Sequence, residues 1–576
     1  MRRAILMLLA LAGGASASGC LHIGGELGSV SLPVSDSTLS SIEARTPSDF
    51  APNTPPSIEN EIALFDKRAL AEGETPESLD LALDQLRALV LSSNLDLAVQ
   101  RLEPQRAQVR VSRAEARFDA LVRVKGAFGD KDTPRLDGPL VDFDSLNPAL
   151  DEESVKLTEL EAEKESLDFG LGVEVPLPTG GSIKLDTMFD GDRTSDPRRF
   201  EQFVSATRFS FSQPLLRGAG TDASFAPIRL ARVEARRVEA RTQLMALGLL
   251  ARAEKAYWSL YASRRVLDVR SEQLRLAAEN LALVQRRVEE GLSAEVEIIR
   301  SRLGVAQRRE SLIVAETAWR VRQRALKAIV NRDDLPLRGA PMIDTTTEPR
   351  LVGFECDPDT LVAEALENRI ELIELELRLV QDNIEVDFRR DQVLPLVNLD
   401  FQYGLLDRND GFDRAWTDQW RFDHHEFKVG LEVELPVANQ RRRAELAESL
   451  LRRTQRYATR EARRMAVRQE VLNAVDTLSQ NWQRVLAARQ NVIVAGVNYD
   501  AEQRQFQEGF RTMREVLEAL SDLGDAQLGE VRAIVDYQVA QIDLAFATGT
   551  LFGYSRVDLD LPDSSDAALE AALRDE

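Results

Sequence analysis

The chain has 576 residues, of which 29% are charged and only 6% are aromatic. This composition is typical of long exposed helices rather than of a thick globular core. The formal net charge of −22 argues against a nucleic-acid partner, because phosphate binding requires concentrated lysine and arginine.

The first twenty residues form a targeting signal. Two arginines precede an apolar run over residues 4–12, and small residues then lead to Cys20. A run this short and this early predicts a secretory signal peptide over residues 1–19 rather than a membrane-spanning helix. The segment ASGC (17–20) resembles a bacterial lipobox, in which the cysteine becomes the acylated first residue. Ala17 stands where leucine is usual, so ordinary cleavage near that residue is the alternative.

A polar segment follows the signal. Residues 20–76 are rich in Ser, Pro and Thr, which predicts an extended N-terminal tether that a lipid on Cys20 would anchor. Only Cys356 would then remain, so we expect no intrachain disulfide even in an oxidising compartment. No later segment reaches the roughly 18 apolar residues of a spanning helix. Any membrane crossing would therefore be made by strands.

The two halves of the chain repeat one plan. A helical pattern over residues 77–116, which Pro104 is expected to kink or interrupt, has a counterpart over 359–391. An ungapped alignment pairs RFDALVRVKGAFG (117–129) with QVLPLVNLDFQYG (392–404), which indicates a tandem duplication. The predicted division is a first structural repeat over 77–335, an inter-repeat linker over 336–358, a second repeat over 359–553 and an acidic C-terminal tail over 554–576.

Segments in both repeats alternate apolar and polar residues. The second repeat has two such segments, at 397–403 and 427–435. The first repeat has four, near residues 122–128, 169–175, 183–189 and 209–211. Period-two alternation in pieces of about ten residues is typical of an outer-membrane β-barrel, and the alternative is a soluble antiparallel sheet with one wet face.

Loop lengths predict the orientation of these strands. The turn at 178–181 is short, whereas segments 130–167, 191–202 and 405–425 are expected to be long acidic loops. Such barrels have short periplasmic turns and long outer loops, so we expect the helices in the periplasm. Six strands per chain cannot close a useful pore, so several chains would share one barrel.

Long proline-free runs follow the strands, over residues 228–335 and 437–561. A heptad seam in the first run predicts left-handed supercoiling and consists of Leu260, Leu267, Leu274, Leu281 and Val288. Residues 228–290 would form a rod of roughly 95 Å. Gly291 and Gly509 stand where each rod should reverse, because glycine tolerates the left-handed conformation of a tight turn.

Taken together, these features resemble the TolC-like outer-membrane efflux protein family, in its lipoprotein form. The resemblance rests on the lipobox-like start, the doubled helix–strand–helix plan, and the segments QPLLRGAG (213–220), ELPVANQ (434–440) and EGFRTMREVLEAL (508–520). It covers about residues 77–553. The implied fold is mainly α with β: tandem duplicated long helical hairpins form a trimeric periplasmic α-barrel, which joins a shared outer-membrane antiparallel β-barrel.

The same resemblance implies a function and its partners. The expected function is a passive channel of a tripartite efflux or type I secretion system, lipid-anchored in the bacterial outer membrane and extending into the periplasm. The expected partners are two further copies of the chain in a homotrimer, a periplasmic adaptor (membrane fusion) protein, an inner-membrane transporter of the RND or ABC type, and outer-membrane lipid. No cofactor is expected.

The resemblance also assigns roles at the helix tips. The family pattern of Gly–aromatic–Arg–Thr and two acidic residues three apart matches Gly509, Phe510, Arg511, Thr512, Glu515 and Glu518. It implies a periplasmic gate of carboxylate rings, with Arg511 and Thr512 in the polar network that holds it shut. The tip turns, expected to dock the adaptor or pump, are Gly291, Leu292, Ser293, Gly509 and Phe510.

An ordinary alternative applies to the same carboxylates. Glu515 and Glu518 could be solvated helix residues that pair with Arg511 and Arg514 at i,i+4 spacing. The corresponding tip of the first repeat retains one acidic residue, Glu297, and is the weaker candidate for a gate.

Other functions have less support. No Ser/His/Asp, Cys/His or paired-carboxylate constellation is visible, so we expect no enzyme, and three His with two Cys do not predict a metal site. The alternative function is a non-transporting lipoprotein coiled-coil scaffold of the envelope. The hairpin at 168–190 departs from the family's four-strand plan. Inside the wall it would give an 18-stranded trimer, and outside it the trimer would keep 12.

Overall fold

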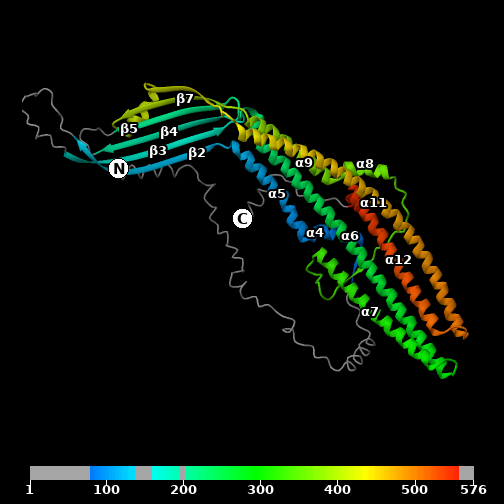
Figure 1. Cartoon of the computed structure of the whole chain (residues 1–576). Coiled ribbons are helices and arrows are strands. Elements are labelled where there is room, and N and C mark those ends of the chain that lie inside the picture. Colours follow the sequence, from blue (N-terminus) through cyan, green and yellow to red (C-terminus); the bar gives the residue numbers. More distant parts are fainter. Residues whose placement is uncertain (1–77, 138–157, 195–201, 557–576) are drawn as a thin grey trace, which may run out of the picture. The chain divides into compact units, whose positions relative to one another are not determined.

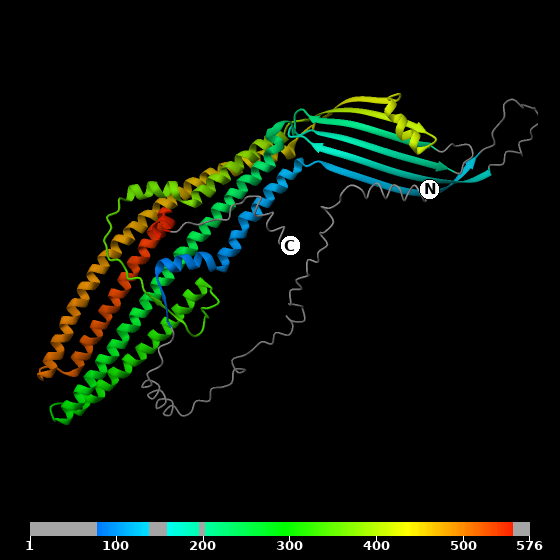
Figure 2. The same cartoon turned by 180° about the vertical axis from the view of Figure 1, so that it is seen from behind.

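The computed structural model describes residues 78–137, 158–194 and 202–556. The predicted signal peptide, Cys20 and the tether up to residue 76 lie outside this part of the chain. The fold is mainly α-helical, with one large antiparallel sheet and one small parallel pair of strands (Figures 1 and 2). None of the described helices is both long enough and apolar enough to cross a bilayer.

Each repeat contains two short helices, a set of strands and a long helical hairpin. The elements of the first repeat are β1 (Ser78–Leu81), α4 (Leu83–Ser93), α5 (Leu95–Glu115), η2 (Ala116–Phe118), β2 (Leu121–Asp137), β3 (Thr158–Pro176), β4 (Ser182–Thr194), β5 (Gln202–Pro214), α6 (Gly220–Glu289) and α7 (Glu295–Val330). β6 (Met342–Thr345) lies in the predicted inter-repeat linker. The elements of the second repeat are α8 (Pro358–Asn368), α9 (Ile370–Gln392), β7 (Leu396–Asn409), α10 (Phe412–Asp418), η5 (Gln419–Arg421), β8 (His425–Glu434), α11 (Gln440–Gln507), α12 (Met513–Thr548) and α13 (Leu551–Ser555).

The duplication holds at the level of element boundaries. The ungapped alignment of the two repeats places the first residue of α4 on that of α8, and the first residue of β2 on that of β7. It also places Asn94, between α4 and α5, on Arg369, between α8 and α9. Each of these two residues binds a carbonyl at the end of a hairpin's return helix: Asn94 Nδ2 donates to Ile329 O at 2.8 Å, and Arg369 Nη1 to Ala547 O at 3.5 Å.

The first helical pattern breaks at a different residue from the one expected. α5 continues through Pro104, and the interruption lies at Asn94 instead. The Asn94 side chain accepts a hydrogen bond from Leu97 N at 3.1 Å, so it caps α5 and offers the backbone an alternative to a continuous helix. The asparagine cap, rather than the proline, therefore sets the boundary.

The sheet contains all six predicted strands, including the hairpin at 168–190. Its order is β2-β3-β4-β5-β7-β8, and every neighbouring pair is antiparallel. The two repeats meet where β5 pairs with β7, for example at Phe211 and Phe401. Within the described residues, the outer edges of β2 and β8 have no partner strand. One chain therefore forms an open sheet.

Two of the expected loops are shorter than predicted. The described residues of segment 130–167 are strand, because β2 and β3 remain paired as far as Asp137 and Thr158. Likewise β4 continues to Thr194 and β5 starts at Gln202. The backbone pairing of these strands thus extends beyond the residues that alternate between apolar and polar side chains. The outer parts of the strands lack this alternation, so the sequence did not predict them as strand. The segment 405–425 contains α10 and η5.

The two faces of the sheet differ in chemistry. One cross-strand row consists of Val173, Leu185, Phe209, Tyr403 and Phe427, and the next row, on the opposite face, consists of Gly172, Asp186, Arg208, Gly404 and Glu426. The apolar face is open to solvent in the single chain: Phe128 is 68% exposed and Leu431 is 63% exposed. An unpartnered apolar face of this kind predicts contact with lipid or another protein.

The long helices form two antiparallel hairpins, α6 with α7 and α11 with α12, whose members lie side by side in both views (Figures 1 and 2). The 70 residues of α6 span roughly 105 Å at 1.5 Å per residue. The predicted heptad seam is only partly correct. Leu260 is buried, but Leu267, Leu274, Leu281 and Val288 are half-buried, and the fully buried line is Gln273, Ala277, Asn280 and Val284.

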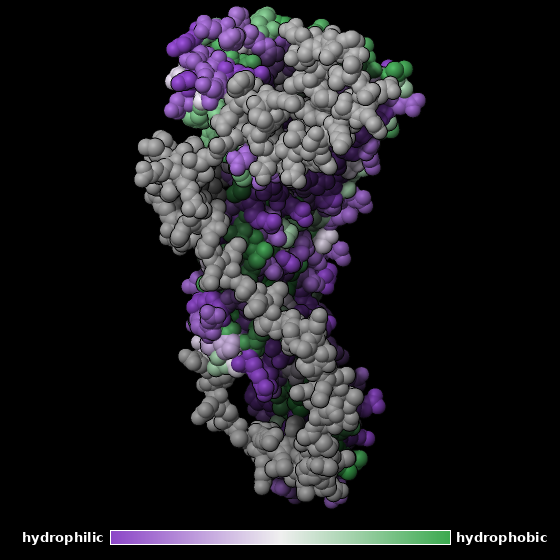
Figure 3. Space-filling view, turned by 90° about the vertical axis from the view of Figure 1, so that its left-hand side faces the viewer, coloured by the Kyte–Doolittle hydropathy of each residue, from purple (hydrophilic) through white to green (hydrophobic). Residues whose placement is uncertain are grey.

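The surface agrees with the composition. Among the residues that are coloured in Figure 3, hydrophilic side chains predominate and hydrophobic ones occur in separate groups. The largest core cluster lies where α4, α6, α7 and α12 meet the pair β1–β6. There, Tyr257 Oη donates to Leu81 O and accepts from Thr347 N, both at 3.0 Å. The sequence reading missed this parallel pair, because β1 opens the first repeat and β6 lies beyond its last helix.

Candidate gate at the helix tips

Both hairpins reverse at the glycines that the sequence singles out. Gly291 has a φ of 72° and Gly509 a φ of 85°, a conformation that favours glycine. Each turn is closed by a backbone hydrogen bond one residue later, from Leu292 N to Arg287 O at 2.7 Å and from Phe510 N to Gln505 O at 2.9 Å.

The tip side chains differ in exposure. Ser293 is half-buried, whereas Leu292 is 64% and Phe510 78% exposed. Two large apolar side chains therefore point into solvent at the tips.

The second tip contains a tight polar network. Arg511 Nη1 donates to Glu515 Oε1 at 3.1 Å, and Arg511 Nε donates to Gln505 Oε1 at 3.0 Å. The Glu502 carboxylate lies 3.4 Å from the same Arg511 Nε. The structure thus brings Arg511 and Glu515 together as the i,i+4 alternative described.

Glu515 also begins α12. It is the third residue of the helix, and its Oε2 accepts from Thr512 N at 2.7 Å and from Thr512 Oγ1 at 3.2 Å, which forms a capping box. The Thr512 N–H is the main reason that the pKa of Glu515 lies below its ordinary value, with Arg511 adding to the effect.

Glu518 has a different environment. Its side chain is exposed, and no hydrogen bond or ion pair involves it among the described residues. In particular, the i,i+4 pair with Arg514 does not form. The two candidate carboxylates are therefore unequal: one is engaged within its own chain and the other is free to act toward the solvent.

We expect acid to loosen the first turn of α12. A carboxylate whose pKa is lowered in the folded state stabilises it above the ordinary value of 4.5, and that stabilisation is lost as the pH falls through the lowered pKa. The protection factors of the amides of residues 512–516, which correct for the intrinsic pH dependence of exchange, should therefore fall on acidification, and Glu515→Gln should remove most of this pH dependence. Thr512→Ala should weaken the same turn at neutral pH by about 1 kcal/mol. Unchanged exchange in both variants would contradict the capping role.

Arg287 connects the two tips and was missed by the sequence reading. Its Nη1 donates to Gln507 O at 2.6 Å, and its guanidinium lies 5.2 Å from the Phe506 ring centroid. At the first tip, Glu297 pairs with Arg300 at 2.6 Å. An arginine near a helix end has no distinctive sequence signal, because its acceptor is a backbone carbonyl in the other repeat.

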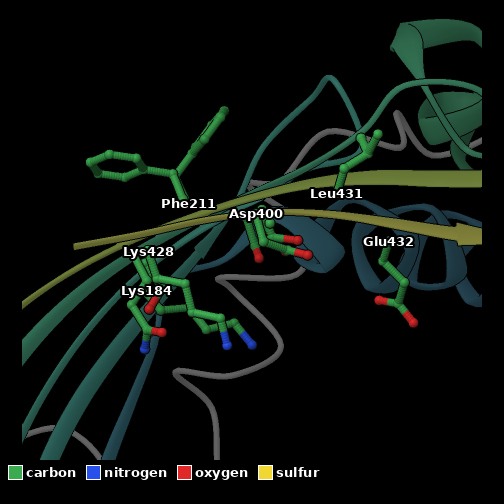
Figure 4. A pocket seen from close by; sticks show the side chains of 12 residues that line it. Lys184, Phe211, Asp400, Lys428, Leu431 and Glu432 are labelled. Atoms are coloured by element: carbon green, nitrogen blue, oxygen red, sulfur yellow. The ribbon is translucent and has the colours of Figure 1, made fainter. Parts of the chain in front are cut away.

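A second polar feature lies on the sheet. A hollow of about 510 Å³ is lined by residues of β4, β5, β7 and β8. Lys184, Asp400, Lys428 and Glu432 extend on one side of the strands, and Phe211 and Leu431 on the other (Figure 4). Two lysines and two carboxylates give a mixed lining, and Lys184 also pairs with Glu174 at 3.0 Å. In the described part of the chain, no group of three or more potential ligands could hold a metal ion.

Part of the chain matches a known protein family. Residues 361–550, which include the second tip, match the model of the outer membrane efflux protein family. The chain is 24% identical over 389 residues to the outer membrane protein TolC of Vibrio cholerae, covering 64% of this chain and 82% of that protein. It is 24% identical over 316 residues to the pyoverdine export outer membrane protein OpmQ of Pseudomonas putida, covering 53% and 63%.

Solved structures share the fold. The CusC structure superposes with a TM-score of 0.58 at 14% identity, over 83% of this chain and 95% of CusC. The outer membrane protein VceC of Vibrio cholerae gives a TM-score of 0.56 at 15% identity, over 81% and 96%. Residues 361–550 thus match the outer membrane efflux protein family, and the duplicated hairpins and antiparallel sheet share the fold of the TolC-like outer-membrane channels.

Proposed function

We propose that this protein is a passive trimeric outer-membrane channel, which carries substrates from an inner-membrane pump of a tripartite efflux or type I secretion system. The observation that carries the proposal is an open six-stranded sheet, with one apolar and one polar face, joined to helices of up to 70 residues. A sheet with an apolar outer face and a polar inner face suits a membrane wall around water. Catalysis is no part of the proposal.

Free edges support assembly into a shared barrel. An unpaired strand edge in lipid leaves backbone groups unsatisfied, so β8 of one copy would pair with β2 of the next. Three copies of the six-stranded sheet would supply 18 strands, with β3 and β4 inside the wall.

The helices also present a surface for a second copy. α11 has an exposed apolar line whose members are spaced by multiples of seven: Leu451, Met465, Leu472, Leu486 and Ile493. A seven-residue repeat is the pattern by which helices supercoil against a partner. The occupant we propose is the neighbouring copy, so that three pairs of hairpins enclose one periplasmic tunnel.

The ends of the molecule would make the remaining contacts. After removal of the signal peptide (1–19), acylated Cys20 would anchor the tether (20–76) in outer-membrane lipid. At the other end, the exposed Leu292 and Phe510 would dock a periplasmic adaptor and the RND- or ABC-type pump, beside the turns at Gly291, Ser293 and Gly509.

The proposed gate is a ring of acidic side chains at the periplasmic entrance. The exposed, unpaired Glu518 would supply the charge that faces the axis, while Arg511 and Thr512 hold Glu515 at the start of α12. Rings of carboxylates attract cations in a narrow pore.

Reconstitution tests the proposal. Full-length protein purified in detergent should insert into planar bilayers with stepwise, ohmic conductance and without nucleotide. Imaging of the same particles should show threefold symmetry and 18 strands. A threefold particle with 12 strands would place the β3–β4 hairpin outside the wall. Absence of conductance from well-folded particles would overturn the channel and favour an envelope scaffold.

A further inference from the structure

α12 packs against the first hairpin at two glycines, one on each hairpin. At each glycine, a side chain of the other hairpin occupies the space that a Cβ would fill. The α12 residues Leu517, Ser521 and Gly524, spaced i, i+4 and i+7, occupy one helix face. The Leu517 side chain fills the space above Gly304 of α7, where an added Cβ would lie 3.1 Å from Leu517 Cδ2. The side chain of Gln273 on α6 fills the corresponding space above Gly524, where a Cβ would lie 1.0 Å from its Nε2.

Arg308 of α7 bonds to the same face. It is only 8% exposed, and its Nη2 donates to Leu517 O at 3.1 Å and to Ser521 Oγ at 3.0 Å. Its Nη1 donates to Gly304 O at 3.2 Å. Arg308 therefore links the two hairpins, because it binds the turn of α12 that contains Leu517, and the Leu517 side chain lies above Gly304.

The guanidinium of Arg308 has no counter-ion in the part of the chain that the structure describes. No carboxylate pairs with it among the described residues, and burial lowers its pKa. A buried cation without an anion costs free energy, even when hydrogen bonds satisfy part of it. The apolar cluster of Met513, Val516 and Leu520 already holds α12 in place. Fold stability therefore does not explain Arg308.

The position of Arg308 relative to the proposed gate does explain why this buried arginine is present. Leu517 lies between Glu515 and Glu518, so the contacts of Arg308 and Gly304 fix the helical turn that bears both carboxylates. We propose that Arg308 and Gly304 form a latch on α7 that holds this turn of α12 in the closed position, and that opening requires Arg308 to release Leu517 O and Ser521. The latch rests on the proposed gate and adds the residues that control it.

Arg308→Met in the full-length protein tests the latch. Loss of the hydrogen bonds to α12 should raise open probability in planar bilayers about tenfold, the effect of losing one hydrogen bond to a charged group. The thermal midpoint should stay within about 2 °C of wild type or rise, because an unpaired buried cation is removed. Arg302→Met is the matched control, since Arg302 is exposed on the same helix without a bonded partner among the described residues.

A second variant avoids the charge altogether. Gly304→Leu should displace Leu517 and also raise open probability, and Ser521→Ala should do so more weakly. Wild-type gating in Arg308→Met, while Glu518→Gln changes ion selectivity, would overturn the latch and leave the channel intact. A higher open probability accompanied by a large fall in the thermal midpoint would also overturn the latch, because that result would show that Arg308 stabilises the fold. Lack of conductance in the wild type would instead overturn the proposed function.

Discussion

Replacement of Glu518 by glutamine should reduce the preference of the channel for cations without loosening the helix tip. Its exposed carboxylate has no bonded partner among the described residues, so its removal breaks no hydrogen bond or ion pair within that part of the chain. A cation that passes about 4 Å away gains roughly 1 kcal/mol from one carboxylate in water, which corresponds to about fivefold in permeability. Reversal potentials in a salt gradient across a planar bilayer measure this ratio.

Glu515→Gln should behave differently. It breaks the ion pair with Arg511 and weakens the bonds from Thr512, so the start of α12 loosens. We expect larger conductance and greater leakage of large antibiotics into cells that bear this variant. The double variant should combine both effects. Glu310→Gln serves as a control, because Glu310 is exposed on α7 away from the tips. Unchanged permeability in the double variant would remove the gate assignment.

Arg369→Met should cause the largest loss of stability. Arg369 is 3% exposed at the break between α8 and α9, and its Nη2 lies 2.7 Å from Glu371 Oε1. It also pairs with Glu470 of α11 and donates to Ala547 O at the end of α12. Removal leaves two carboxylates with Arg463 as their remaining partner. Breaking a buried pair costs about 3–5 kcal/mol, and the partial exposure of Glu470 favours about 3.

The thermal midpoint in detergent and protease resistance of the α8–α9 region measure this loss. Arg390→Met is the control, since Arg390 forms an exposed pair with Asp387 and should change little. The pH dependence adds a second readout. Burial tends to raise the pKa of Glu371, but hydrogen bonding to Arg369 outweighs it and the pKa is lowered. The stabilisation is therefore present above pH 4.5 and is lost as the pH falls through the lowered value. A variant with the wild-type midpoint and acid response would contradict this role.

The helices, strands and tips could be predicted because each has a local period. Gly291 and Gly509 interrupt helical periodicity, and the strand segments alternate over a few residues. The boundary between α4 and α5 was predicted less well, because it depends on a capping residue and not on a period. The break in the first helical pattern was predicted at Pro104 and not at Asn94, although an asparagine before Leu-Asp-Leu-Ala is a recognisable helix start.

The residues of the candidate gate were only partly predictable. The spacing that resembles the family pattern predicted Glu515 and Glu518 as candidates. It could not predict that only Glu515 bonds to Arg511 and Thr512, because this depends on which side chain reaches them. Arg287 and Arg308 could not be found in this way. Both donate to backbone carbonyls on the other hairpin, and any residue supplies such a carbonyl.

By itself, the sequence determined the duplicated helix–strand–helix plan, the six strands of the large sheet and the places where the long helices reverse. These features follow from short-range periodicity, which burial imposes on each element separately. The tertiary structure alone decided that β5 joins β7, that β1 pairs with β6, and that Gly304 and Gly524 receive side chains from the opposite hairpin. Such contacts join segments that lie far apart along the chain, so packing selects them and no local pattern records them.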